Sequence, residues 1–372
     1  MITIVEANTK KLLLDFIKFP FSLYKKHPYW VPPLINDELE TFDKSKNPAF
    51  ENADAIFYLA YQNNKIVGRV CAIINWDEVK KQHKSKIRFG WFDFIDDIEV
   101  SRALLHKVSE IGKQNNLQYM EGPMGFSNLD KVGVLTEGFN EIGSMITWYN
   151  YPYYAQHLEK LGFTKEKEYL ENKFPFANVK SEHFEKANNL VRKRYELQSL
   201  TFKKTKDIMP YVDEMFELFN ASYANLSSFV AITNSQKEYF KKKYISFINP
   251  EYIIFVQDKN SKLVGFSIVM PSFAAALQKA NGKLFPFGFY HLIQAKKNSK
   301  EVLFYLIGIA PEYQNKGVHA VIFDEYFKTF TNKKILNCIR TPELSDNHAI
   351  HNIWKHFNPE TFKKRCTYRI DL

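Results

Sequence analysis

Long apolar runs are missing from this sequence of 372 residues. No stretch reaches the ~18 to 20 apolar residues that a helix needs to cross a bilayer. The N-terminus MITIVEANTKKLLLDF places Lys10, Lys11 and Asp15 where a signal peptide requires apolar residues. We therefore expect a cytoplasmic protein without a transmembrane helix.

Cysteine is also scarce, and the three that are present are Cys71, Cys338 and Cys366. An odd number at wide spacing fits neither a disulfide framework nor a zinc-ligand pattern, so three buried thiols are predicted. Helical spacing also relates His348, His351 and His356, but no Cys or carboxylate lies at a suitable position beside them. No metal site is predicted.

Acidic residues do not balance the basic ones, and the formal net charge is +10. Residues 1–175 carry 22 Lys and Arg against 23 Asp and Glu, while residues 176–372 carry 29 against 18. The whole excess is therefore in the second half, where it attracts CoA phosphates, nucleic acid or anionic lipid, or is simply a solvated surface. Neither a recognition-helix signature nor an aromatic RNA-binding motif is present, so we expect no nucleic-acid partner.

The order of elements repeats along the chain, as expected for two domains of roughly 150 to 200 residues each. The first half reads as a hairpin (IFYLAY, KIVGRVCAII), the strand RFGWFDFI, a helix over about 98–114, the strands LQYMEG and MITWY, a helix ended by Gly162 and a closing strand from Phe163. The second half reads as helices over 209–224 and 236–247, the hairpin YIIFVQDKNSKLVGFSIVM, the strand EVLFYLIGIA, a helix to about Phe330, the strand KILNCIR, a helix over 347–357 and the strand CTYRIDL. This alternation predicts an α/β fold with sheets of mixed strands, in domains 1–175 and 176–372.

The stretch YLIGIAPEYQNKGVHAVIFDEYF carries the strongest chemical signal. An apolar strand ends in a polar, Gly-containing loop that opens a helix, so successive backbone N–H groups and the helix N-terminus converge on one point. Gly317 lets a phosphate approach the backbone, and Lys316 adds a point charge. The alternative is a plain connection in which the glycine only turns the chain.

This stretch resembles the signature of the GNAT superfamily of acyl-CoA N-acyltransferases, in which Gln or Arg, two residues, Gly, one residue and then Gly or Ala wrap the CoA pyrophosphate. Here these positions are Gln314, Gly317 and His319. The resemblance implies acyl-CoA or acetyl-CoA as co-substrate, held by the loop residues Gln314, Asn315, Lys316, Gly317, Val318 and His319.

The whole chain also resembles tandem GNAT-like bacterial proteins through HPYWVPPL, NPAF, GRVCAIIN, EGPMGFSN, LTEGF, YNYPYY and LFPFGF. Relatives with this architecture include enzymes that put long acyl chains on lipid amines. The resemblance implies that backbone amides from Leu306 to Ile309, including Gly308, polarise the thioester carbonyl where the fourth strand of the second half separates from its neighbour. It also implies that Asn347 binds the cofactor. Trp354 stands at the position where the family often carries a Tyr that can protonate the leaving CoA thiolate.

Three residues are candidates for the general base. Glu301 and Tyr305 share one face of the fourth strand by period-two spacing, and His319 lies at the loop. We favour His319 because its ordinary pKa near 6.5 suits an acceptor of an ammonium proton. A partly exposed histidine at a helix start is the alternative.

The equivalent loop of the first half is different, because FIDDIEVSRALL has no glycine and its acidic residues would repel phosphate. The first half is therefore expected to shape the acceptor pocket, with the amine in the cleft between the halves. The insertion from Pro271 to Lys300 is rich in Phe and edged by Lys, and it predicts an extra helical layer, an acyl-chain tunnel or a contact with a membrane surface.

The predicted function is transfer of an acyl group, including a long one, from acyl-CoA to a small-molecule or lipid amine. A catalytically degenerate GNAT-fold protein that binds CoA or lipid is the alternative.

Overall fold

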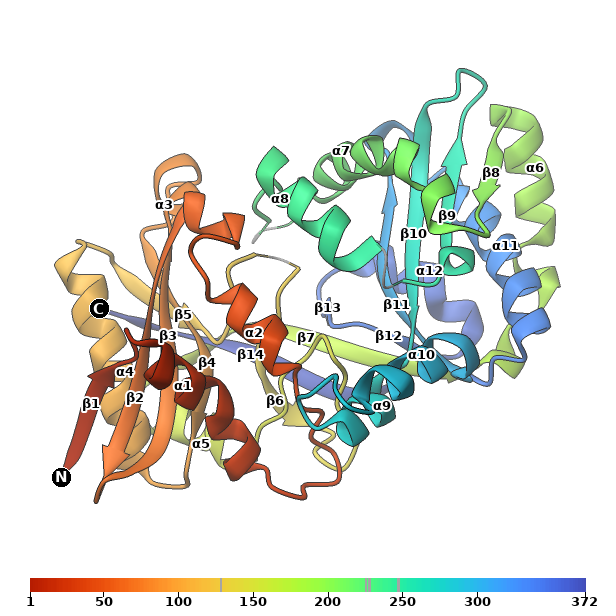
Figure 1. The fold of residues 1–372 in the computed structure, drawn as a ribbon. Coiled ribbons are helices and arrows are strands. Elements are labelled where there is room, and N and C mark those ends of the chain that lie inside the picture. Colours follow the sequence, from red (N-terminus) through yellow and green to blue (C-terminus); the bar gives the residue numbers. More distant parts are fainter. Residues whose placement is uncertain (128, 225, 227–228, 246–247) are drawn as a thin grey trace. The chain divides into compact units, whose positions relative to one another are not determined.

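The computed structural model describes residues 1–127, 129–224, 226, 229–245 and 248–372 (Figure 1). The chain forms two compact units. Unit 1 consists of residues 1–170, 274–291 and 362–372, and unit 2 of residues 171–273 and 292–361. Each unit has a mixed sheet with helices against it, so the predicted α/β fold class is confirmed.

The sheet of unit 1 contains, in spatial order, β1 (Ile2–Glu6), β2 (Ala53–Gln62), β3 (Lys65–Asn75), β4 (Lys86–Phe94), β5 (Tyr119–Gly122) and β14 (Glu360–Asp371), with β6 (Val134–Glu137) also paired to β14. β2 and β3 form the predicted hairpin, turned at Asn63 and Asn64 with φ of 50° and 60°. β4 and β5 are parallel and joined by α4 (Ile98–Gln114).

Two cores lie on opposite faces of this sheet, because successive side chains of a strand alternate. Tyr58 of β2 belongs to the core with α4 and α5 (Tyr153–Lys160), and Phe57 to the core with α1 (Lys10–Leu23) and α2 (Ile35–Thr41). α3 (Trp76–Lys81) follows β3.

The sheet of unit 2 contains, in spatial order, β8 (Gln198–Thr201), β9 (Ile253–Gln257), β10 (Leu263–Pro271), β11 (Glu301–Ile309), β12 (Asn337–Arg340) and the part of β7 (Thr164–Pro175) from Glu171 on, with β13 (Glu343–Leu344) also paired to β7. β11 and β12 are parallel and joined by α11 (Val318–Lys333).

Helices cover both faces of the sheet of unit 2 (Figure 1). A Cβ at Gly265 of β10 would meet Val318 of α11, whereas Phe266 lies against Phe219 of α7 (Val212–Tyr223). α6 (Glu185–Tyr195) packs beside α11, and α12 (His348–Trp354) follows β13. The helix expected over 236–247 is α8 (Asn234–Phe240) continued by a π-helix over Lys241–Ile245, and its predicted last residue, Phe247, lies outside the described residues.

The last strand of each sheet comes from a distant part of the chain. β14 pairs with β5 in unit 1, where Tyr368 lies opposite Gly122, and β7 pairs with β12 in unit 2, where Phe174 lies opposite Cys338. The sequence lists the strand from Phe163 last in the first half and the C-terminal strand last in the second, whereas residues 173–175 of β7 pair with β12 in unit 2 and β14 pairs with β5 in unit 1. The two strands have similar patterns, and only packing against distant partners selects their places.

The region before α5 differs from its predicted secondary structure. The strand expected over MITWY is wrong: residues 145–149 form a turn, where the Arg365 side chain donates to the Trp148 carbonyl at 2.6 Å. The strand in this region is β6, which Asn150 ties in by accepting from the Leu135 amide at 2.6 Å.

The three cysteines are confirmed as buried free thiols. Across the described chain, no helix is both long and apolar enough to span a bilayer.

Candidate functional site

A strand, a short turn and a helix form the loop predicted to hold phosphate. β11 ends at Ile309, a 3-10 turn covers Pro311–Tyr313, and α11 begins at Val318. Asn315 and Gly317 have φ of 60° and 81°, and Gly317 is the N-cap of α11. Glycine adopts this left-handed conformation without steric cost, and asparagine tolerates it better than most residues. The sequence motif thus folds into a tightly turned loop at a helix N-terminus.

The backbone amides of this loop are available to an anion. The Lys316 amide donates to the Tyr313 carbonyl at 3.3 Å, whereas no acceptor among the described residues takes the amides of Asn315 and Gly317. The first-turn amides of α11 lack partners within the helix by geometry. Amides that converge at a helix N-terminus form an anion site without any charged side chain.

Two side chains fix this loop from outside. Gln314 Nε2 donates to the Ile309 carbonyl at 3.3 Å and so ties the loop to the end of β11. Lys316 Nζ lies 5.5 Å from the ring centroid of Tyr195 and 5.4 Å from that of Tyr313. Such cation–π contacts hold the ammonium group beside the exposed amides.

Next to the loop, β11 separates from β12. Their parallel pairing ends where Phe304 lies opposite Arg340, and the pairing of β11 with β10 skips Tyr305, the extra residue of a β-bulge. Gly308 stays in register, opposite Phe266 of β10. A Cβ there would lie 2.3 Å from the Phe266 ring, so packing against β10 requires the glycine.

Beyond the bulge, β12 no longer pairs with β11, and two backbone amides of β11 face this unpaired edge. The Ala310 amide donates to the Val264 carbonyl at 2.9 Å. Because an antiparallel ladder alternates, the amides of Ile307 and Ile309 point the opposite way, towards the open edge. The Tyr223 hydroxyl donates to the Ile307 carbonyl on that side at 3.1 Å. The open edge therefore offers backbone donors beside the phosphate loop.

Tyr223 is a residue of this site that the sequence did not reveal. It lies near the end of α7, 84 residues before Ile307, and its only signal in the sequence is the apolar period of that helix. Burial raises the pKa of Tyr223 to about 12, against the opposing effect of its hydrogen bond to Ile307. The phenol therefore stays protonated, as a donor, at neutral pH.

The structure places the three candidate bases differently. His319 lies in the first turn of α11, partly buried, with its ring centroid 6.0 Å from that of Phe323. Burial, and secondarily the charge of His356, lowers its pKa, so the ring is neutral at pH 7. Tyr305 lies at the bulge, and Glu301 lies four residues earlier, about 13 Å along the strand from it.

The two residues expected near α12 serve local structure. Asn347 caps the helix, because its Oδ1 accepts from the Ile350 amide at 3.3 Å. Trp354 is buried, with its ring centroid 4.7 Å from Phe304 and 4.9 Å from Phe323, and its Nε1 has no acceptor in the described structure. Among the described residues, no group of His, Cys, Asp or Glu is arranged to hold a metal ion.

Known proteins resemble the chain along almost its whole length. A tandem GNAT protein from the clavulanic acid biosynthesis pathway, solved without AcCoA, matches with a TM-score of 0.58 over 100% of this chain and 98% of that one, at 11% identity. The chain has the tandem GNAT fold. A GCN5-related glucosamine N-acetyltransferase region of a fungal multi-domain β-N-acetylglucosaminidase also matches, with a TM-score of 0.55 at 10% identity over 100% of this chain and 38% of that one.

Two curated proteins are similar in sequence. Protein YghO of Escherichia coli K12 is 26% identical over 96% of this chain and 93% of its own length. A bacterial ceramide synthase of Caulobacter vibrioides is 23% identical over 84% of this chain and 82% of its own length. No protein-family model matches the chain.

Within the tandem GNAT fold, unit 1 has a different helix start in place of the phosphate loop. The Asp97 carboxylate caps α4 and accepts from the Glu99 amide at 2.9 Å, and Asp96 Oδ1 lies 3.0 Å from His157 Nε2. The Nδ1 of His157 lies 3.0 Å from the Ser101 hydroxyl, but Ser101 is fully buried, so this trio fastens α4 to α5. Carboxylates thus occupy the helix N-terminus of unit 1.

The corresponding strand of unit 1, β4, is covered along its whole length. All nine residues of β4 are buried, whereas β11 is partly exposed at five positions. In unit 1 the space beside β4 is filled by Tyr24, whose hydroxyl lies 2.9 Å from Asp93 and 2.7 Å from the Tyr154 hydroxyl. Arg69 pairs with the same Asp93 at 2.7 Å.

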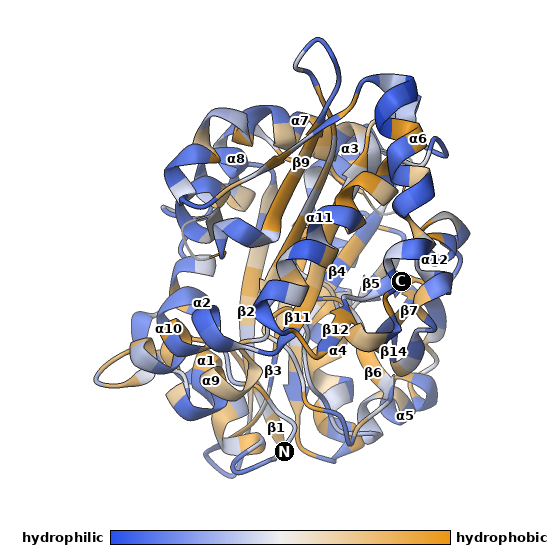
Figure 2. Cartoon of the chain, turned by 90° about the vertical axis from the view of Figure 1, so that its right-hand side faces the viewer, coloured by the Kyte–Doolittle hydropathy of each residue, from blue (hydrophilic) through white to orange (hydrophobic). Residues whose placement is uncertain are grey.

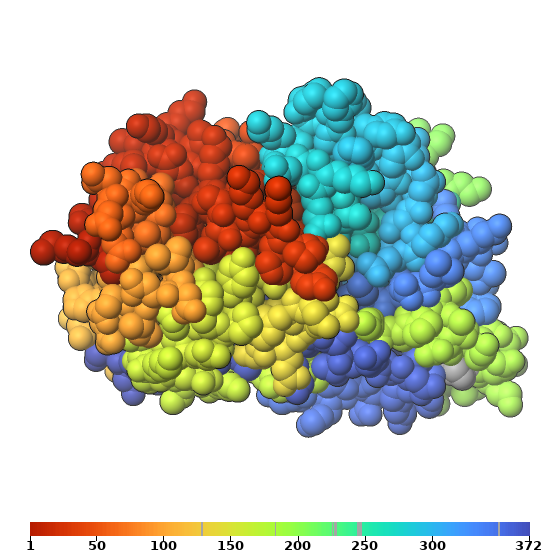
Figure 3. Space-filling view, turned by 90° about the horizontal axis from the view of Figure 1, so that it is seen from below, coloured from red at the N-terminus to blue at the C-terminus, as the bar shows by residue number. Residues whose placement is uncertain are grey.

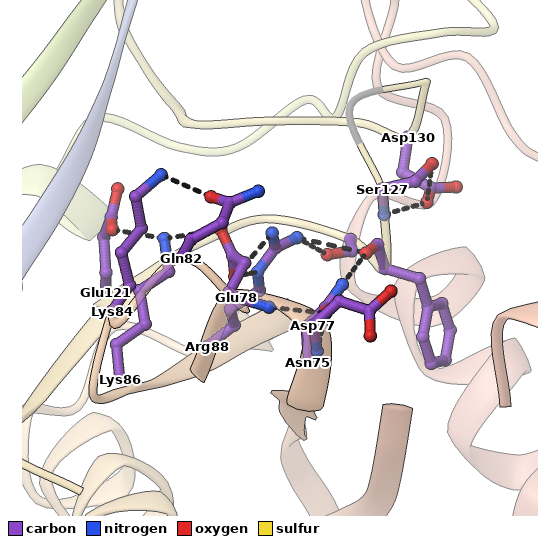
Figure 4. Close-up of polar contacts among 12 residues, drawn as sticks. Asn75, Asp77, Glu78, Gln82, Lys84, Lys86, Arg88, Glu121, Ser127 and Asp130 are labelled. Atoms are coloured by element: carbon purple, nitrogen blue, oxygen red, sulfur yellow. Dashed lines mark hydrogen bonds and ion pairs between the residues drawn. The ribbon is translucent and has the colours of Figure 1, made fainter. Parts of the chain in front are cut away.

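A buried ionic network in unit 1 is a second cluster of polar residues (Figure 4). Glu78 of α3 accepts from Arg88 at 2.7 Å and pairs with Lys86 at 3.1 Å, and Lys86 also pairs with Glu121 of β5 at 2.8 Å. Burial alone would raise the pKa of Glu78, but Arg88 and Lys86 lower it below its usual value. Lys167 also pairs with Glu121, at 3.7 Å, and Arg88 donates to the Gly125 carbonyl at 2.7 Å. The network fastens α3, β4, β5 and the following loop.

Proposed function

We propose that this chain transfers an acyl group from acyl-CoA to an amine at a single site in unit 2. The observation that carries the proposal is the contrast between the units. Unit 2 combines an uncapped loop of amides at the N-terminus of α11 with a partly exposed strand edge, whereas the same places in unit 1 are occupied by carboxylates and aromatic side chains. The CoA pyrophosphate would bind the amides of Asn315, Gly317, Val318 and His319, with the Lys316 side chain adding charge.

In the proposed reaction, the thioester carbonyl oxygen accepts from the amides of Ile307 and Ile309, which are positioned before the substrate binds. The amine nitrogen attacks the carbonyl carbon, a C–N bond forms, and the C–S bond breaks to release the CoA thiolate. The ammonium proton passes to the neutral ring of His319, and the thiolate takes a proton from solvent. Much of the acceleration would come from holding the reactants together.

The acceptor we propose is a lipid amine. The support is the similarity to a protein named a bacterial ceramide synthase, which matches 84% of this chain. A tunnel is one of the alternatives for the insertion, but Phe285 and Phe287 are 76% and 71% exposed, which does not favour enclosure of these two side chains. Donor length is therefore best measured, by comparing kcat/KM for acetyl-, octanoyl- and palmitoyl-CoA with a long-chain amino alcohol and with small amines.

The competing proposal is a protein that binds CoA or lipid without turnover. It is favoured by Trp354, since an indole N–H cannot act as the acid that a phenol provides at that place. A single-turnover mixture of protein, acyl-CoA and amine separates the two. Amide formation with stoichiometric release of CoA thiol supports the enzyme, whereas tight CoA binding without amide from any donor refutes it.

We also propose that residues 176–372 hold the only CoA loop and that residues 1–175 have lost theirs. Because β7 and β14 each complete the sheet formed mainly by the other part of the chain, separately expressed halves would expose unpaired strand edges. The test therefore uses point variants in the full chain, such as those at Gly317 described below.

A further inference from the structure

Exposed apolar side chains gather in one short segment of the molecule, the connection between α9 (Ala274–Ala280) and α10 (Gly288–Asn298) and the first turns of α10. Nine large apolar side chains are classed as exposed among the described residues, and five of them lie within residues 285–293. The five are Phe285, Phe287, Phe289, Tyr290 and Ile293. Figure 2 shows this connection projecting from the two helices, with apolar colouring along it, and Figure 3 shows the cyan segment open on the face drawn.

The segment that precedes these exposed side chains is fixed by hydrogen bonds to residues near α1 and α2. Gln278 Nε2 donates to the carbonyls of Pro28 and Trp30, at 2.8 and 3.0 Å, and the Ile35 amide donates to the Gly282 carbonyl at 3.0 Å. A Cβ at Gly282 would lie 2.6 Å from the Phe21 ring, so the chain passes very close to α1 here. The inward positions are therefore filled, and the aromatic residues that follow must point outward.

The aromatic residues form a compact surface. The rings of Phe285 and Phe289 lie 5.6 Å apart, and the Phe289 amide donates to the Leu284 carbonyl at 2.8 Å, which fixes the start of α10. Phe289 and Ile293 are four residues apart and share one helix face. A rigid aromatic tip followed by an amphipathic helix start is typical of segments that enter the headgroup region of a bilayer.

The positive charge of this segment favours a bilayer with anionic headgroups. Residues 272–300 contain five lysines and no Asp or Glu. Lys279 and Lys283 precede the aromatic residues in the chain, Lys297 lies in the last turn of α10, and all three are exposed. Cations beside an apolar surface are attracted to anionic headgroups while the aromatic side chains enter the interface.

We propose that the segment from Lys279 to Lys297 docks this protein on the surface of an anionic lipid bilayer. Phe285 and Phe287 enter the interface, and Lys279, Lys283 and Lys297 contact the headgroups. This docking is separate from the chemistry at the loop of α11 and does not depend on turnover.

The experiment measures sedimentation of the full-length protein with vesicles of equal parts phosphatidylcholine and phosphatidylglycerol, and with vesicles of phosphatidylcholine alone. We expect binding to the anionic vesicles that weakens with salt. The double variant F285S/F287S should lower the partition coefficient at least roughly tenfold, since burial of one phenylalanine is worth more than a tenfold change in an equilibrium. The triple variant K279Q/K283Q/K297Q should remove the preference for anionic vesicles.

The matched control is L190S/L336S, which removes two apolar side chains that are 64% and 62% exposed outside this segment and should leave binding unchanged. Thermal unfolding of every variant checks that the fold is kept. Equal binding of F285S/F287S and the unaltered protein would overturn the proposal, as would the absence of binding to anionic vesicles. Self-association in sedimentation velocity that F285S/F287S abolishes, with no vesicle binding, would instead assign the surface to a second copy of the chain.

Discussion

Replacing Gly317 by glutamate would place a carboxylate inside the proposed anion site. Gly317 has a φ of 81°, and a Cβ there would lie 3.0 Å from Val191 Cγ2. Left-handed strain costs roughly 1–2 kcal/mol in a residue with a side chain. One pair of like charges 4 Å apart is repelled by about 4 kcal/mol at an effective dielectric constant of 20. Solvent at the loop screens part of this, so we expect CoA affinity to fall at least about a hundredfold.

Isothermal titration calorimetry with CoA measures the affinity, and thermal unfolding reports whether the variant is folded. Gly317→Ala separates strain from charge, because it introduces the same backbone conflict without a carboxylate. Gly162→Glu is the matched control: its φ is 89° and its nearest neighbour, Ile370 Cδ1, lies 3.7 Å away in unit 1. A folded Gly317→Glu protein that binds CoA as tightly as the unaltered chain would refute the assignment of the loop.

Three further changes test the structure. Glu78→Gln should lower the free energy of unfolding by about 3–5 kcal/mol in urea denaturation, because it leaves the buried Arg88 guanidinium without a carboxylate partner; an unchanged urea midpoint would contradict the network. The folded-state pKa of His319 is below its ordinary value of 6.5, so stability should be lost as pH falls below about 6.5 and level off beneath the folded-state pKa; His319→Gln should flatten this slope, and an equal slope would count against burial of the ring. Tyr223→Phe removes the donor to the Ile307 carbonyl, and thermal unfolding should show a loss of about 0.5–1.5 kcal/mol; an unaltered melting temperature would show that this bond adds nothing.

Features encoded by neighbouring residues could be predicted from the sequence. The hairpin of β2 and β3 follows from two alternating apolar strands around Asn63 and Asn64, and the loop before α11 follows from a strand, a polar turn and Gly317 within a few consecutive positions. Both depend on local backbone geometry, which residue type strongly restricts. The α/β class follows because such units can bury their apolar faces only by stacking helices on sheets.

The tertiary structure decided what depends on residues far apart in the chain. The sequence patterns of the strands from Phe163 and from Cys366 do not determine their partners. Only packing pairs the first with β12 in unit 2 and the second with β5 in unit 1. The hydroxyl of Tyr223 meets β11 across 84 residues of chain. The sequence left a helical layer, a tunnel or a membrane contact open for the phenylalanines after α9, and the structure shows that Phe285 and Phe287 are exposed. Residue type restricts the backbone locally, one residue at a time. Whether a side chain is buried depends on which distant segments pack against it, and this is determined only when the whole chain has folded.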